Sequence, residues 1–194
     1  MGVEGFPFEG GVLCFLLLLG FYLGSQSLLL FVVVIPVTLF GTWLFRESDV
    51  KVALDPIAYT VLGVFYTAGL GGYFLLIHNL EGGKHMIIFL LLFIWAGDAS
   101  AYYVGRNLGK NKLISSVSPN KTVEGAIGNV VGTLLAAFIA KLWFFKGFSL
   151  PHCLIAAFIC GIIGQLGDFL ESLIKRNCRV KDSGSLIPGH GGLL

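Results

Sequence analysis

The run "LPHCLIAAFICGIIGQLGDFLESLI", residues 150–174, is long and apolar enough to cross a lipid bilayer as one helix. A bilayer core needs about 20 mostly apolar residues per helix, within a range of roughly 17–25. The run nevertheless contains two carboxylates, Asp168 and Glu171, near its C-terminal end. Charges inside a membrane segment are costly and by default indicate function. This stretch therefore predicts a helical membrane protein, and it predicts a site near Asp168.

The remaining sequence has the same character. Hydrophobic residues make up 56% of the 194 residues and charged residues only 12%, about half the charged share of a typical soluble domain. We expect an all-α integral membrane protein, one polytopic domain over residues 1–194, with about six transmembrane helices. The "GLGG" at residues 69–72 predicts a kink or break in the third helix. The six predicted spans are residues 10–23, 28–45, 55–79, 86–104, 119–145 and 150–174.

The fifth span is predicted to begin at a proline. Ser118 followed by Pro119 is typical of an N-cap and a first helical position. Lys121 would then lie in the first turn, where it opposes the helix dipole. A bound phosphate would remove that local cost, so the pattern favours an anion site there.

Six spans would place the connecting loops alternately on the two sides of the membrane, and positive charge is distributed unequally between these sides. Ten of the 13 Lys and Arg residues fall in the loops of one side, which also contains the motif-rich loops. An excess of Lys and Arg marks the cytoplasmic side. We therefore expect the polar site on the cytosolic side. The net charge of +2 is too small to indicate a nucleic acid partner.

Polar residues share one face of the sixth predicted helix. Asp168, Glu171, Ser172, Lys175 and Arg176 follow helical spacing. One interpretation is a functional stripe. The other is a structural ladder with Glu171 paired to Lys175 and Asp168 to Ser172.

The segment "WAGDASAYYVGR" adds a third intramembrane carboxylate, Asp98. Ala101, Tyr102 and Gly105 lie on its helical face, and small residues there would let another helix approach. Asp98 is either a metal or substrate ligand, or a structural acceptor for a hydroxyl on a neighbouring helix. The residues leave both alternatives open.

Two basic segments follow these helices. The loop "GKNKLISSVSPNKTVEG" combines lysines with hydroxyls, which favours a phosphate site, although attraction to anionic lipid headgroups is the simpler alternative. In the tail "VKDSGSLIPGHGG", Lys181 and Asp182 are candidates for binding phosphate and metal, and a solvated terminus is the alternative. Carboxylates beside cations suit Mg²⁺ bridged to nucleotide phosphates.

Three blocks of this sequence together match a known pattern. The stretch "SLIKRNCRVKDSGSLIPGHGGLL" at residues 172–194 resembles the signature of phosphatidate cytidylyltransferase, or CDP-diacylglycerol synthase. "GDASAYYVGRNLGKNKL" and "SPNKTVEG" resemble the upstream blocks of that family, so the resemblance covers roughly residues 95–194. Residues 1–90 carry only a generic membrane signal.

This resemblance implies a nucleotidyltransferase that joins CTP and phosphatidic acid into CDP-diacylglycerol and pyrophosphate, with Mg²⁺ or another divalent cation. It implies catalytic roles for Asp168, Lys181 and Asp182, with Asp168 as a metal ligand; Asp98 is the second candidate metal ligand, on the residue argument above. The residues implied to bind substrate are Ser118, Lys121, Ser172, Lys175, Arg176, His190, Gly191 and Gly192.

The family pattern continues with an acidic residue immediately after the position of Leu194. We therefore expect this chain to be a fragment or truncated reading frame that resembles the enzyme without catalysing the reaction. The alternatives are a CTP-dependent lipid or polyprenol kinase and an ion-coupled transporter with Asp98 and Asp168 as a relay. The bilayer is an expected partner and a homodimer is among the expectations.

Overall fold

The computed structural model describes residues 5–46, 53–145, 147–178 and 180. These residues are mostly helical and form two compact units, Met1–Lys84 and His85–Leu194. Each unit is described by itself, and the prediction of a single domain stays a prediction. The helical class is confirmed, except that the second unit also contains a short β-hairpin.

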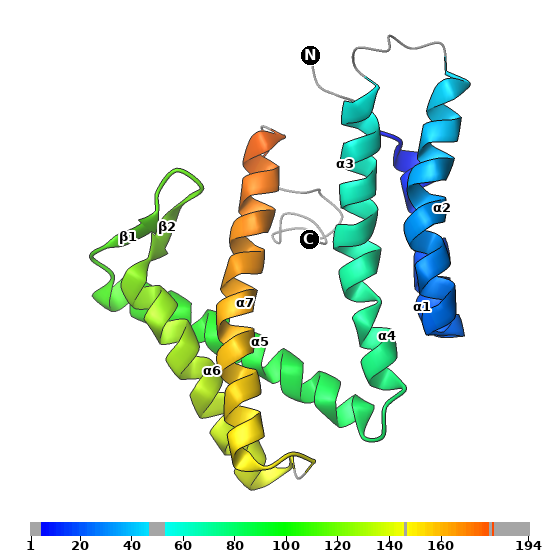
Figure 1. The fold of residues 1–194 in the computed structure, drawn as a ribbon. Coiled ribbons are helices and arrows are strands. Elements are labelled where there is room, and N and C mark those ends of the chain that lie inside the picture. The colour runs from blue at the N-terminus through cyan, green and yellow to red at the C-terminus, as the bar shows by residue number, and fades with distance from the viewer. Residues whose placement is uncertain (1–4, 47–52, 146, 179, 181–194) are drawn as a thin grey trace. The chain divides into compact units, whose positions relative to one another are not determined.

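The first unit is built from apolar helices around one core. Gly24 adopts φ +117°, which a side chain would resist, and so lets α1 turn back into the antiparallel α2 (Figure 1). Leu13, Leu17, Ile35 and Leu39 are buried between the helices. The elements of this unit are α1 (Pro7–Leu23), α2 (Ser25–Leu44), α3 (Leu54–Val64), a π-helical turn (Phe65–Gly69) and α4 (Tyr73–His78).

The "GLGG" segment interrupts the third apolar run, as predicted. The α-helical pattern gives way to the π-helical turn at Phe65–Gly69 and breaks again at Gly72, before α4 begins. A Cβ atom at Gly72 would lie 2.6 Å from Cγ of Phe21. Glycine at this position therefore lets α1 and the broken helix approach closely.

The second unit contains three long helices and the hairpin. Its core buries Phe89, Phe93, Ala137 and Cys153. Figure 1 shows the hairpin at the N-terminal end of α6, and α6 packs along α7. The elements are α5 (Gly83–Leu108), β1 (Lys112–Ile114), β2 (Ser118–Thr122), α6 (Val123–Trp143) and α7 (Leu150–Asn177).

The predicted start of the fifth span at Pro119 is wrong. Ser118 and Pro119 belong to strand β2, which pairs antiparallel with β1, and α6 begins at Val123. Pairing with β1 holds Ser118 in a strand, and the chain becomes helical only from Val123, so Ser118 does not cap a helix. Thr122 is the N-cap, and its Oγ1 accepts a hydrogen bond from the Gly125 N–H at 3.1 Å. Lys121 therefore lies on a strand, and the argument that it opposes a helix dipole fails.

Small residues bring α5 and α6 into close contact. A Cβ atom at Gly125 would lie 3.0 Å from the Ala101 carbonyl oxygen, and one at Gly128 would lie 2.7 Å from the Val104 side chain. A Cβ atom at Gly132 would collide with Ser100. The prediction that the small residues beside Asp98 let another helix approach is confirmed.

Among the residues that the structure describes, four helical segments are long and apolar enough to cross a membrane: Leu54–His78, Gly83–Leu108, Val123–Trp143 and Leu150–Asn177. Two shorter apolar helices, Pro7–Leu23 and Leu28–Leu44, occupy the positions of the first two predicted spans. The chain therefore has the helices of a membrane protein, and the count of six spans stays a prediction.

Candidate functional site

A cavity of about 530 Å³ in the second unit collects residues from α5, the hairpin, α6 and α7. Four of the predicted site residues line it: Asp98 from α5, Ser118 and Lys121 from β2, and Asp168 from α7. These residues are distant in sequence and polar, although the helices around them are apolar. The cavity is therefore the candidate functional site.

An ion pair joins the hairpin to α7 at this cavity. The Lys121 Nζ atom donates a hydrogen bond to Asp168 Oδ2 at 3.0 Å and lies 4.4 Å from the centroid of the Phe169 ring. The Lys121 side chain is 32% exposed and that of Asp168 53%. Asp168 thus pairs with Lys121, and the structural alternative that paired it with Ser172 is not what the structure shows. Because both charges stay accessible, a charged ligand can reach them.

Asp98 lies in the electric field of the same pair. Its carboxylate interacts unfavourably with Asp168 and favourably with Lys121. Within the described ranges, no hydroxyl donates a hydrogen bond to Asp98, so the structure gives no support to its role as a structural acceptor. The described lining of the cavity therefore combines two carboxylates, Asp98 and Asp168, with two cations, Lys121 and Arg106.

The donor chemistry of this pocket fits a divalent cation. Mg²⁺ is usually bound through one or two carboxylates together with substrate phosphates and water, and Asp98 and Asp168 supply two carboxylates on one cavity. No third His, Cys, Asp or Glu joins them among the residues that the structure describes. The cavity can hold a cation that also binds a phosphate-bearing ligand.

The hairpin that carries Lys121 is tied down at its base. The Glu124 carboxylate accepts hydrogen bonds from the backbone N–H of Lys110 at 3.1 Å and from that of Asn111 at 3.2 Å. It also accepts one from Asn111 Nδ2 at 2.8 Å. These contacts close the loop between α5 and β1 onto the first turn of α6. The position of Lys121 is therefore set by both helices.

The other predicted residues of α7 do not line the cavity. Ser172, Lys175 and Arg176 lie beyond Asp168 toward the end of the helix. Lys175 donates to Glu171 Oε1 at 2.7 Å, which confirms the structural interpretation of that pair. The predicted tail residues lie outside the described residues: Lys181, Asp182, His190, Gly191 and Gly192.

Several polar residues that line the cavity were not predicted as site residues, among them Tyr102, Arg106, Asn129 and Gln165. Arg106 Nη1 donates to the Tyr102 hydroxyl at 3.0 Å, and both residues line the cavity with Asp98. Their spacing of four and eight residues from Asp98 could have identified them. Asn129 and Gln165 also line the cavity, and each is a polar residue in an otherwise apolar helical run.

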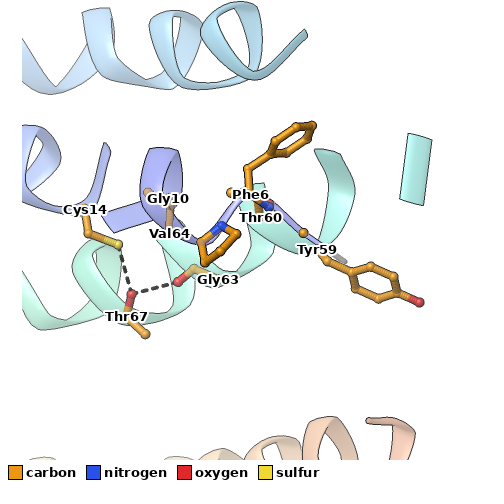
Figure 2. A pocket seen from close by; sticks show the side chains of 10 residues that line it. Phe6, Gly10, Cys14, Tyr59, Thr60, Gly63, Val64 and Thr67 are labelled. Carbon is orange, nitrogen blue, oxygen red and sulfur yellow. Dashed lines mark hydrogen bonds between the residues drawn. The ribbon is translucent and has the colours of Figure 1, made fainter. Parts of the chain in front are cut away.

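The first unit contains a different kind of cavity. It measures about 670 Å³, lies between α1 and α3, and contains none of the predicted site residues (Figure 2). Its polar groups satisfy one another: Thr67 Oγ1 donates to the Gly63 carbonyl oxygen and contacts Cys14 Sγ, and the Phe6 N–H donates to Thr60 Oγ1. Of these two cavities, the one in the second unit is lined by charged side chains and the one in the first unit is not.

Comparison with known proteins agrees with the sequence resemblance. The chain is 40% identical over 141 residues to the phosphatidate cytidylyltransferase of Bacillus subtilis, covering 72% of this chain and 52% of that protein. It is 39% identical over 150 residues to the enzyme of the same name from Staphylococcus saprophyticus, covering 77% of this chain and 54% of that protein. The chain thus spans about half the length of the curated relatives it matches. The sequence model of the cytidylyltransferase family matches residues 3–194, nearly the whole chain. The chain therefore belongs to the cytidylyltransferase family.

Proposed function

We propose that this chain carries the nucleotide-handling part of an enzyme that transfers a cytidylyl group from CTP to phosphatidic acid. The products are CDP-diacylglycerol and pyrophosphate. The observation that carries the proposal is the meeting of Asp98, Lys121 and Asp168, from three separate elements, in one cavity of about 530 Å³. The names of the similar bacterial proteins support the substrates.

The cations of the cavity suit a triphosphate. Lys121 is a compact positive charge on a strand whose hairpin is tied down at its base, and Arg106 adds a planar guanidinium with several donors. A phosphate can replace Asp168 as the partner of Lys121, because that pair is accessible. Ser118, on the same strand, presents a hydroxyl that can donate to a phosphate oxygen.

Asp98 and Asp168 are the residues that would hold a divalent cation, which we propose to be Mg²⁺. When bound, such an ion neutralises phosphate charge and polarises the phosphoryl oxygens. The two carboxylates repel each other across the pocket, so a cation between them would relieve that repulsion. Asp168 would then exchange Lys121 for the metal, leaving the lysine free for substrate.

The transfer itself requires mostly positioning and charge neutralisation. A phosphate oxygen of the lipid attacks the α-phosphorus of CTP and forms a new P–O bond. The bond between that phosphorus and the bridging oxygen to the β-phosphate breaks, and pyrophosphate leaves with the electron pair. Lys121 and Arg106 stabilise the negative charge that develops during this step.

We also propose that the cavity opens to the cytosol in a chain with six spans, as the excess of Lys and Arg on one set of loops predicts. This places the cavity where CTP is available. Phosphatidic acid would reach it from the bilayer that surrounds the helices. A homodimer stays a prediction.

The test uses the full chain in lipid vesicles with phosphatidic acid, Mg²⁺ and CTP labelled at the α-phosphate. We expect CTP binding that is strongly reduced in Asp168→Asn, without label in the lipid fraction; label there would show that this chain also catalyses the transfer. Asp55→Asn, an exposed carboxylate of α3, is the matched control and should behave as the parent chain. In a parallel assay with CTP labelled at the γ-phosphate and a lipid alcohol, transfer of label would instead support a lipid kinase, and ion flux without nucleotide binding would support a transporter. A chain that neither binds CTP nor transfers label would contradict the proposal.

A further inference from the structure

Two amide side chains that line the cavity have no part in the proposed reaction. Gln165 lies on α7 one turn before Asp168, and Asn129 lies on α6 in the second turn after its start. Both line the cavity. Amides in apolar helices need hydrogen-bond partners. The hydrogen-bond partners that these two amides lack therefore indicate which groups a ligand could supply.

The amide of Gln165 is held in one orientation. Its Nε2 donates to the Gly161 carbonyl oxygen at 2.8 Å and to the Ala126 carbonyl oxygen at 3.3 Å. An amide nitrogen has two hydrogens, and both are used here. Rotating the amide by half a turn would lose both bonds. The Oε1 atom, which accepts no hydrogen bond from the described part of the chain, is therefore presented as a fixed acceptor.

Asn129 adds a second unmet acceptor at this level. Its side chain is 5% exposed, and Oδ1 is buried without a hydrogen-bond partner within the residues described. Glycines on both neighbouring helices make room for it: a Cβ atom would lie 2.9 Å from Nδ2 at Gly97 and 3.4 Å from Oδ1 at Gly161. A buried acceptor left unpaired destabilises a fold. Because Oδ1 is closed off in this structure, the Asn129 side chain must turn toward the cavity before a ligand's N–H donor can reach it, and the new hydrogen bond would then remove this penalty.

We propose that this amide floor, Gln165 and Asn129, selects the cytosine base by accepting hydrogen bonds from its exocyclic amino group. The inference rests on the proposed use of CTP. Cytosine presents an amino donor at the position where uracil presents a carbonyl acceptor. A carbonyl placed against fixed acceptors is repelled, so the floor admits CTP and rejects UTP. The spacing along α7 agrees with this proposal, because Gln165 and Asp168 lie one turn apart on the same side of the helix. The base of the bound nucleotide would lie toward the amide floor and its phosphates toward Lys121.

The experiment measures equilibrium competition of labelled CTP by unlabelled CTP and UTP on the full chain in nanodiscs. We expect UTP to bind at least about tenfold more weakly than CTP, the factor that one well-placed hydrogen bond supplies. Gln165→Leu should weaken CTP about tenfold and leave UTP unchanged or improved. A residue with a merely structural role would lower both affinities together.

Asn129→Leu is the second variant, since it replaces the amide with an apolar side chain of similar size. We expect a smaller loss of preference for CTP, together with a higher unfolding temperature because the unpaired acceptor is gone. Asn107→Leu, at an exposed amide of α5 that does not line the cavity, is the matched control and should change neither affinity.

The outcomes separate the inference from the function on which it rests. Equal loss of both nucleotides in Gln165→Leu, or equal binding of CTP and UTP by the parent chain, overturns the amide floor and leaves cytidylyl transfer standing. A preference for CTP that survives in both variants also overturns it. Failure of the parent chain to bind either nucleotide overturns both.

Discussion

The contact between α5 and α6 allows a sharp test of how the cavity is built. In Gly132→Ala, the new Cβ atom would lie 2.5 Å from Ser100 Cβ and 2.9 Å from the Ala96 carbonyl oxygen. Comfortable carbon contacts begin near 3.5 Å, so the two helices must separate by about 1 Å at this point. Neither obstacle can rotate away, because one is a backbone atom and the other is bonded directly to the backbone.

This strain should exceed the benefit that alanine brings to a helix. Overpacking costs about 1–3 kcal/mol, and replacing glycine by alanine inside a helix contributes up to about 1 kcal/mol in the opposite direction. We expect Gly132→Ala to lower the free energy of unfolding by about 1–2 kcal/mol. Because Asp98 lies on α5 close to this contact, the displacement should also weaken CTP binding. Denaturant unfolding in detergent, followed by circular dichroism, measures the first effect and nucleotide competition the second.

The matched control is Gly164→Ala on α7, where a Cβ atom would meet nothing within 4 Å. This variant should be as stable as the parent chain or slightly more stable. The reasoning is refuted if Gly132→Ala and Gly164→Ala unfold at the same denaturant concentration, because the close packing of α5 on α6 would then have no energetic consequence.

Three further predictions test the hairpin and the orientation of the chain. Lys121→Met should weaken CTP binding at least about tenfold, because a charge-assisted contact is lost. The control Lys112→Met, on the exposed strand β1, should change CTP binding less than twofold. Equal losses of CTP binding in the two variants would show that only overall charge matters. Thr122→Ala should destabilise α6 by about 1 kcal/mol through loss of its N-cap, measured as a lower unfolding midpoint, and an unchanged midpoint would show that the cap contributes nothing. A membrane-impermeant maleimide should label the exposed Cys178 only from the cytosolic side, and labelling from the opposite side would contradict the proposed orientation.

Much of this protein could be predicted from composition and periodicity alone. The apolar runs give helices at nearly the predicted positions, and the last two elements end within a few residues of the expected bounds. The reason is that the hydrophobic requirement of a bilayer acts locally, on each run of about 20 residues. The carboxylates Asp98 and Asp168 were also identifiable, because a charge in such a run is unusual.

The start of α6 was not predictable in the same way. Ser118 and Pro119 carry a local helix signal, yet β2 pairs with β1, and Glu124 fixes the loop ahead of β1 by hydrogen bonds across 13 and 14 residues. A local rule cannot weigh contacts that form only once the chain has folded back. The same holds for the partner of Asp168: helical spacing offered Ser172 as one alternative, and the structure shows Lys121.

The sequence by itself determined that the chain is an apolar helical protein of the cytidylyltransferase family, with acidic and basic residues set apart for chemistry. Only the tertiary structure decided which of these residues meet. Asp98, Lys121 and Asp168 come together because glycines on α6 let α5 approach and because the hairpin folds toward α7. The tertiary structure also showed that the amides of Asn129 and Gln165 line the cavity with oxygens that are unpaired among the described residues. Whether a hydrogen-bonding atom lacks a partner depends on the space around that atom and not on the residue type.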